Sequence, residues 1–141
     1  MKLIEKSLLI ALRAYAGKTD KAGREYILHP LRVMAKMETE MEMSAALLHD
    51  VIEDSEITAQ DLLDEGIPAE VVEAVRCLTK NEGEEYMAFV ARAKRNKLAA
   101  KVKKADIEDN IDVLRLASLN EYDLARIQKY HAAWHFLNEE P

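Results

Sequence analysis

Apolar residues recur at intervals of three and four along most of this chain, which is the spacing of one face of an α-helix. Leu8, Leu9, Leu12 and Tyr15 form the first such stripe. In chain order, the pattern predicts helices over 3–16, from Pro30 to the acidic stretch at 38–42, and over 45–53, 58–64, 68–78, 84–95, 98–116 and 121–137. With no strand pattern, internal repeat or low-complexity linker, the sequence predicts an all-α fold, a single-domain bundle of roughly seven to eight helices spanning 1–141.

The few residues that end or start helices fit these ranges. Gly17 follows the first predicted helix as a C-terminal cap, because glycine accepts the left-handed conformation. Pro30 suits a first helical turn, and Pro68 opens a later helix. Ser44 and Thr58 each precede a predicted helix, where a side-chain oxygen can accept a backbone N–H.

Composition narrows the class of protein and its partners. Hydrophobic residues make up 49% and charged residues 33%, which is typical of a globular domain. The net charge of −6 argues against a partner that is a nucleic-acid polymer, but it allows a small anionic substrate. No apolar run approaches the roughly 20 residues of a membrane span, and the charged N-terminus does not resemble a signal peptide. We therefore expect a cytoplasmic protein without a membrane partner. The sequence allows a homo-oligomer but does not decide the oligomeric state.

The single cysteine, Cys77, excludes an intrachain disulfide and a cysteine-based zinc cluster. Because Cys77 falls in an amphipathic stretch, we expect it to pack in the core. No glycine-rich phosphate loop and no Ser-His-Asp or Cys-His nucleophile is evident. The chemistry therefore has to come from histidines and carboxylates.

The strongest chemical signal is His49-Asp50 followed by Glu53-Asp54. On a helix, His49 lies one turn from Glu53, and Asp50 lies one turn from Asp54. Four ionisable groups would then crowd one side of an element whose preceding residues, 45–48, are apolar. A solvated helix face is the alternative interpretation. Since buried unpaired charge is costly, a divalent cation bound by His49 and Asp50 explains the pattern better.

Two further ligands are needed, and two candidates stand elsewhere in the chain. His29 precedes Pro30 at a helix start, although a lone histidine there is more often a capping or packed residue. Asp106 is one turn from Asn110 and follows Lys103 by one turn, although this pattern also suits a charged helix surface. A mixed set of histidines and carboxylates suits Mn²⁺, Fe²⁺ or Zn²⁺.

Such an ion can lower the pKa of a water molecule and hold a phosphate oxygen. Glu53 and Asp54 would then lie close enough to orient or deprotonate that water. The pair His131 and His135, also one turn apart, is a competing metal motif. It lacks the glutamate of a His-Glu-x-x-His site, and its aromatic neighbours favour packing.

From about residue 5 to 135, the chain resembles the HD-superfamily hydrolase domain of bifunctional alarmone synthetase/hydrolases and their stand-alone small relatives. The matching motifs are, in order, Tyr26-Ile27-x-His29-Pro30, His49-Asp50-x-x-Glu53-Asp54 and Lys103-x-x-Asp106-x-x-x-Asn110. The resemblance implies an HD-type helical bundle with one Mn²⁺, or another divalent transition metal, held by His29, His49, Asp50 and Asp106. Glu53 and Asp54 would act on the attacking water.

The family reaction removes pyrophosphate from the 3′-diphosphate of guanosine tetra- or pentaphosphate. The resemblance implies that Tyr26, Lys103 and Asn110 contact the nucleotide. Family members often carry an arginine beside the guanine where this chain has Asp20, so Lys21 and Arg24 are the candidates to replace it. Two alternatives follow: a hydrolase of a different nucleotide, and a non-catalytic nucleotide-sensing module.

Overall fold

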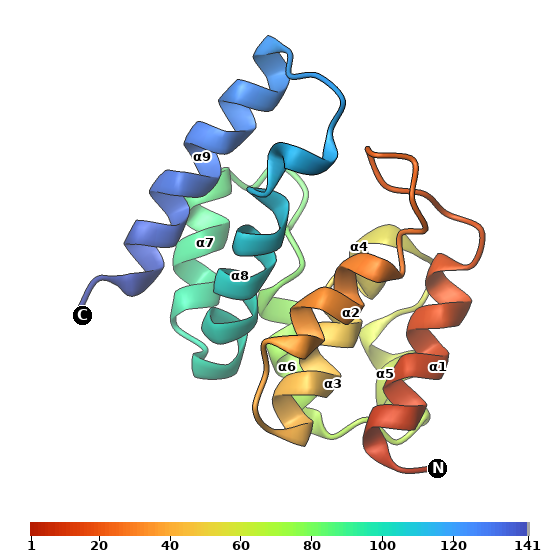
Figure 1. The fold of residues 1–141 in the computed structure, drawn as a ribbon. Coiled ribbons are helices and arrows are strands. Elements are labelled where there is room, and N and C mark those ends of the chain that lie inside the picture. The colour runs from red at the N-terminus through yellow and green to blue at the C-terminus, as the bar shows by residue number, and fades with distance from the viewer. Residues whose placement is uncertain (141) are drawn as a thin grey trace.

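The computed structural model describes residues 1–140, and all regular elements among them are helical apart from one isolated bridge between Thr19 and Glu25 (Figure 1). The predicted all-α fold is confirmed. The elements are α1 (Leu3–Tyr15), α2 (Leu28–Ala35), α3 (Glu40–Leu48), α4 (Val51–Asp54), α5 (Ala59–Asp64), α6 (Ala69–Cys77), α7 (Tyr86–Lys94), α8 (Lys97–Asn110), the 3₁₀ helix η1 (Val113–Arg115) and α9 (Glu121–Asn138).

Two groups of helices meet along α3 and α8. Helices α1 to α6 lie on one side of the molecule, and α7 to α9 lie on the other (Figure 1). Helix α3 packs against α1, α2, α6 and α8, while α8 packs against α2, α3, α6, α7 and α9. These two helices therefore carry side chains into the middle of the fold.

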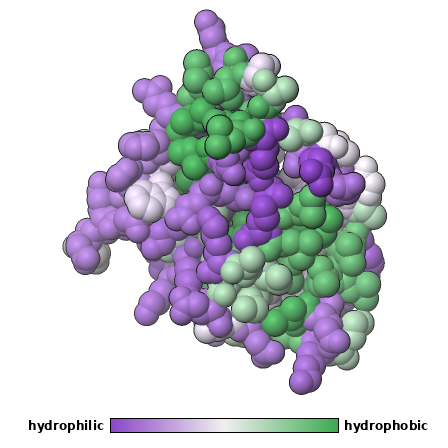
Figure 2. Space-filling model, viewed as in Figure 1, coloured by the Kyte–Doolittle hydropathy of each residue, from purple (hydrophilic) through white to green (hydrophobic). Residues whose placement is uncertain are grey.

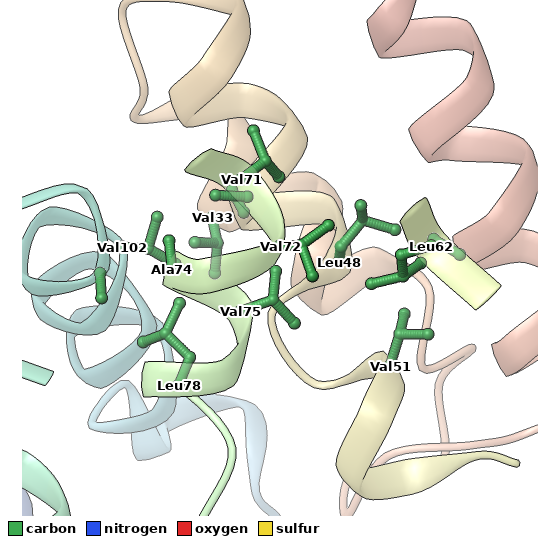
Figure 3. Packing of buried hydrophobic residues seen from close by; sticks show 14 of the residues in the cluster. Val33, Leu48, Val51, Leu62, Val71, Val72, Ala74, Val75, Leu78 and Val102 are labelled. Atoms are coloured by element: carbon green, nitrogen blue, oxygen red, sulfur yellow. The ribbon is translucent and has the colours of Figure 1, made fainter. Parts of the chain in front are cut away.

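Each group of helices has its own apolar core. The main core lies among α1 to α6 and the start of α8 (Figure 3), and its fully buried members include Ile10, Val33, Leu48, Val51, Leu62, Val71, Val75 and Val102. The C-terminal core joins α7, α8 and α9 through Val90, Ile107, Ala133 and Leu137. Burying one such aliphatic side chain stabilises the fold by about 1.5–3 kcal/mol. The two cores hold the two groups of helices, and the polar residues considered below lie between them.

Several predicted helix ends are confirmed. The Thr58 side chain accepts the backbone N–H of Asp61 and so caps α5. Gly17 follows α1 with a φ of +79°, the left-handed conformation that glycine tolerates best. Pro68 immediately precedes α6, and Pro30 lies in the first turn of α2.

The acidic stretch at 38–42 was expected to end the second helix, and that expectation is wrong. Thr39 caps α3, its side chain accepts the Glu42 N–H, and Glu42 in turn accepts the Thr39 N–H. Ser44 is consequently not a cap. It is fully buried inside α3, with its Oγ 2.6 Å from the Oγ of Ser7 on α1.

Two predicted helices are interrupted in the structure. The expected helix 45–53 divides into α3 and α4, with His49 and Asp50 in the turn between them. The expected helix 98–116 ends at Asn110, and the Asp112 side chain accepts the Leu114 N–H to start η1. In both places, side chains of polar residues bind backbone groups that would otherwise continue or flank the helix.

Three further features are the exposed apolar residues, the single cysteine and the absence of a membrane-spanning helix among the described residues. Leu114, Leu119, Tyr122 and Leu124 are exposed at the connection from α8 to α9, where Figure 2 shows an apolar region at the top of this face. Cys77 is half-buried and packs against the main core. Across residues 1–140, we find no helix with the length and apolar character of a bilayer span.

Candidate metal centre

Four side chains from three separate segments converge between the two cores. They are His29 of α2, His49 and Asp50 of the α3–α4 turn, and Asp106 of α8, and one potential ligand atom from each lies within 4.8 Å of all the others. The Nε2 atom of His29 is 3.3 Å from the Nε2 atom of His49 and 2.9 Å from Oδ1 of Asp106. The structure thus brings together all four residues that the sequence predicted as metal ligands.

The far side of each imidazole ring is fixed by a hydrogen bond. The Nδ1 atom of His49 is 2.6 Å from the carbonyl oxygen of Ala46, which can only accept, so Nδ1 carries the proton. The Nδ1 atom of His29 lies 2.6 Å from Oδ2 of Asp109. In the neutral rings each Nε2 atom then carries a lone pair, and the two Nε2 atoms are 3.3 Å apart, which fits a bound cation.

The electrostatics of the four residues also favour a cation. Burial opposes charge on His49, but Asp50 and Asp106 outweigh it and raise the pKa of His49 well above its ordinary value. Burial likewise opposes charge on Asp106, but Lys103 and His49 hold its pKa well below its ordinary value. The buried carboxylates demand positive charge, which protons on the histidines or a divalent metal can supply.

Hydrogen bonds from neighbouring side chains hold the two carboxylates in place. The Tyr26 hydroxyl donates to Oδ2 of Asp50 at 2.8 Å, and burial and Asp50 raise the pKa of Tyr26, so the phenol keeps its proton. The Asn110 amide donates to Oδ1 of Asp106 at 2.8 Å. Lys103 donates to the other oxygen of Asp106 at 3.1 Å. The three residues implied as nucleotide contacts therefore also orient the predicted metal ligands.

A cavity of about 350 Å³ opens beside His29, and we call it the His29 cavity. Its walls come from the α1–α2 loop, α2, the end of α8, η1 and the start of α9. The polar residues that line it include Lys21, Tyr26, Arg32, Asn110, Arg115, Arg126 and Tyr130. Its volume lies within the range of small-molecule sites.

The structure distinguishes between the two candidate nucleotide contacts in the α1–α2 loop, Lys21 and Arg24. Lys21 lines the His29 cavity, whereas Arg24 lies outside its lining, largely exposed, with its guanidinium 4.0 Å from Glu25. Asp20 accepts the backbone N–H groups of Ala22 and Arg24, at 2.8 and 2.9 Å. The Asp20 carboxylate therefore holds the loop together.

Glu53 and Asp54 lie on α4, directly after the metal centre. Glu53 is exposed and accepts the backbone N–H of Lys80 at 3.1 Å. Asp54 contacts the hydroxyl of Tyr15 at 3.4 Å. Burial, Asp50 and Glu53 together raise the pKa of Asp54 to about 6. A carboxylate with that pKa can exchange a proton near neutral pH.

The sequence did not single out Asp109, which the structure places behind His29. Its carboxylate also accepts from Arg32 at 2.7 Å and from the Arg115 guanidinium at 3.4 Å. The spacing Asp106-x-x-Asp109 was visible, but nothing in the sequence distinguished Asp109 from the neighbouring Glu108. The competing pair His131 and His135 stacks on α9, exposed and outside the one cluster that could hold a metal among residues 1–140.

Most of the similar curated proteins are named as (p)ppGpp hydrolases, and a putative GTP diphosphokinase of Arabidopsis thaliana is 29% identical over 132 residues, covering 90% of this chain and 14% of that protein. Over 86 residues the chain is 42% identical to the bifunctional (p)ppGpp synthase/hydrolase SpoT of Escherichia coli K12, which covers 57% of this chain and 12% of that protein. Over 66 residues it is 41% identical to the guanosine-3′,5′-bis(diphosphate) 3′-pyrophosphohydrolase of Vibrio cholerae, with 44% and 9% covered. The chain thus spans only 9% to 14% of these relatives. No family model matches it.

The fold has a counterpart among solved structures. A structure described as a metazoan ortholog of SpoT that hydrolyzes ppGpp superposes with a TM-score of 0.76 at 23% identity, covering 97% of this chain and 84% of that one. The chain has an all-α fold of the HD type, and its His/Asp cluster supplies ligands that suit a divalent metal. The sequence relatives that match it at 41% and 42% identity are named as (p)ppGpp hydrolases.

Proposed function

We propose that this protein is a metal-dependent nucleotide 3′-pyrophosphohydrolase whose substrate is guanosine-3′,5′-bis(diphosphate). The observation that carries the proposal is the convergence of His29, His49, Asp50 and Asp106 within 4.8 Å, beside a cavity of about 350 Å³. The names of the relatives supply the nucleotide. The domain's location in the cytoplasm and its oligomeric state stay predictions.

We propose Mn²⁺ as the metal, since mixed histidine and carboxylate ligands suit it, as they suit other divalent transition metals. When bound, the metal supplies positive charge that makes water more acidic and polarises a phosphoryl oxygen. Asp109 and the Ala46 carbonyl keep the two histidine rings in the orientation that exposes Nε2. Tyr26 and Asn110 keep the carboxylates of Asp50 and Asp106 turned inward.

The reaction follows from the chemistry of a phosphoryl ester. The oxygen of a water molecule forms a bond to the phosphorus attached to the ribose 3′-oxygen, and the bond between that phosphorus and the 3′-oxygen breaks. The 3′-oxygen leaves with the electron pair and takes a proton, giving the nucleoside 5′-diphosphate and pyrophosphate. Asp54, with a pKa of about 6, accepts the proton of the water, and Glu53 orients it.

The nucleotide is held by residues around the cavity. Lys21 lies in its lining and can pair with a phosphate or contact the base, while Tyr26 and Asn110 lie where the cavity meets the metal centre. For Arg24 to take part, the α1–α2 loop has to move, because Arg24 lies outside the lining. Lys103 supplies a buried positive charge next to Asp106.

A second candidate is the same reaction on a different nucleotide. It is favoured by Asp20, whose carboxylate is bonded within its own loop and cannot stack on guanine as an arginine does. Asp20 also lines the cavity, so an acidic side chain lies beside the proposed nucleotide site.

A nucleotide panel tests the proposal. The purified protein with Mn²⁺ is incubated with guanosine-3′,5′-bis(diphosphate) and with other 3′- and 5′-phosphorylated nucleotides, and released phosphate and pyrophosphate are measured. We expect pyrophosphate from the guanosine substrate, loss of release in Asp106→Ala, and normal release in the control Asp64→Ala, an exposed residue of α5. Faster release from another nucleotide supports the second candidate. Binding without any turnover supports a sensing module and contradicts both hydrolase proposals.

A further inference from the structure

A cluster of positive side chains lies on the α7 side of the metal centre, outside the lining of the His29 cavity. The Lys103 Nζ atom is 4.8 Å from the ring centroid of Phe89 and 5.8 Å from that of Tyr86. The Lys129 Nζ atom, on α9, is 4.4 Å from the centroid of Tyr86. The ring of Tyr86 therefore lies near one buried lysine and one exposed lysine.

Several cationic side chains gather at this cluster, although the whole chain carries a net charge of −6. Burial and the cations of Arg126, Lys103 and Lys80 lower the pKa of Lys129. Lys103 is bonded to Asp106, but within residues 1–140 neither Lys80 nor Lys129 has a carboxylate at salt-bridge distance. Unpaired cations that repel one another in this way are stabilised by an anion.

The hydroxyl of Tyr86 adds a hydrogen-bond donor to this cluster. It is buried, and among residues 1–140 it has no hydrogen-bond partner. A buried polar group without a partner costs about 1–3 kcal/mol, so its presence calls for a ligand. The centroid of its ring is 5.8 Å from the Nζ atom of Lys103, which bonds Asp106, so Tyr86 lies in the region beside the metal centre.

We propose that Tyr86, Lys103 and Lys129, with Lys80 at the rim, form a subsite for a phosphoryl group next to the metal centre. The subsite rests on the proposed function and assigns the outer phosphate of the 3′-diphosphate to it. Lys103 links the two regions, because its Nζ atom is 3.1 Å from the oxygen of Asp106 that does not face His29. The nucleotide itself occupies the cavity on the other side, where Arg126 and Tyr130 form the shared wall.

The test measures binding of inorganic pyrophosphate by calorimetry to protein loaded with one equivalent of Mn²⁺ and freed of excess metal. Tyr86→Phe removes one hydrogen bond, and Lys129→Gln removes one positive charge. Each is expected to weaken pyrophosphate binding about tenfold, the effect of losing one hydrogen bond to a charged group. The matched control is Lys97→Gln, an exposed position outside the cluster, and it is expected to bind as the unsubstituted protein does.

Thermal unfolding of the ligand-free protein separates a binding role from a structural one. Since the Tyr86 hydroxyl has no partner, Tyr86→Phe is expected to keep or raise the melting temperature while it weakens pyrophosphate binding. A marked fall in melting temperature would mean that the hydroxyl bonds within the protein, and this would overturn the subsite.

The two proposals fail in different ways. If Tyr86→Phe and Lys129→Gln bind pyrophosphate as tightly as the unsubstituted protein, which itself hydrolyses the guanosine substrate, the subsite is wrong and the proposed function stands. If pyrophosphate binding depends on both residues but no nucleotide is hydrolysed, the subsite stands and the proposed function is wrong.

Discussion

His49 and Asp50 show how single residues set the geometry of the site. They lie in the turn between α3 and α4, and Asp50 has φ −103° and ψ 0°, outside the usual helical region. The His49 ring bonds the carbonyl of Ala46, one turn back, and so turns its Nε2 inward. The one-turn spacing to Glu53 that the sequence indicated is consequently not the geometry of the site.

Asp109 is a positioning residue for His29, and we expect Asp109→Asn to weaken metal binding. The substitution keeps the shape but removes the charge that holds the Nδ1 proton and the guanidinium of Arg32. Changes to such supporting groups typically cost about 10- to 100-fold in metal affinity. Calorimetric titration with Mn²⁺ measures the effect against Asp64→Asn, and equal affinities in the two variants would contradict it.

In the metal-free protein, the ionised Asp54 side chain is expected to destabilise the fold at neutral pH. Its pKa is raised from the ordinary 3.8 to about 6, so between those values the folded state holds a proton that the unfolded state has lost. Stability therefore falls as the pH rises through this window and stays lower above it. A shift of about two pKa units corresponds to about 3 kcal/mol in the free energy of unfolding, and solvent screening at this partly exposed residue reduces that to about 1 kcal/mol.

Asp54→Asn should consequently raise the melting temperature of the metal-free protein at pH 7.5, leave it nearly unchanged at pH 4, and lower hydrolysis. Thermal scans at both pH values measure the stability effect, with Asp64→Asn as the control. An equal shift at both pH values would show that ionisation of Asp54 is not the cause.

At the scale of helices, caps and buried contacts decide where each element starts and how it packs. Thr39 and Glu42 start α3 earlier than the apolar pattern suggested. That earlier start places Ser44 on the face of α3 that meets α1, where it bonds Ser7. Sequence alone did not distinguish a serine that caps a helix from one that is buried within it.

The contact between Ser7 and Ser44 predicts a non-additive pair of substitutions. Both residues are fully buried, so Ser7→Ala alone leaves the other hydroxyl without a partner and should destabilise the protein by about 1–3 kcal/mol. The double variant Ser7→Ala with Ser44→Ala should be less destabilised than the sum of the two single variants. Urea unfolding measures the four free energies, and simple additivity would sink the prediction.

At the scale of the whole molecule, the metal centre lies where the main core and the C-terminal core meet. Its ligands come from α2, the α3–α4 turn and α8, so binding a cation ties together segments that are distant along the chain. Without a cation, the buried carboxylates rely on protonated histidines for charge balance.

Metal removal is therefore expected to destabilise the entire fold. A metal at 100 times its dissociation constant stabilises the folded state by about 2.7 kcal/mol, if the unfolded chain does not bind it. Thermal unfolding with added Mn²⁺ and then with a chelator should show a higher melting temperature with the metal. Asp106→Ala should show no such difference, and an unchanged melting temperature in the unsubstituted protein would refute a bound metal.

The sequence by itself determined the helical class, because the spacing of apolar residues is a local property that each segment carries. It also identified His29, His49, Asp50 and Asp106 through short motifs whose residue types suit a divalent cation. Only the tertiary structure decided that these four side chains meet, that Asp109 bonds His29, and that Tyr86 and Lys129 lie on the Lys103 side of the site. Those contacts join residues far apart in the chain, and their energies depend on burial and on the direction of side chains, which no local pattern contains.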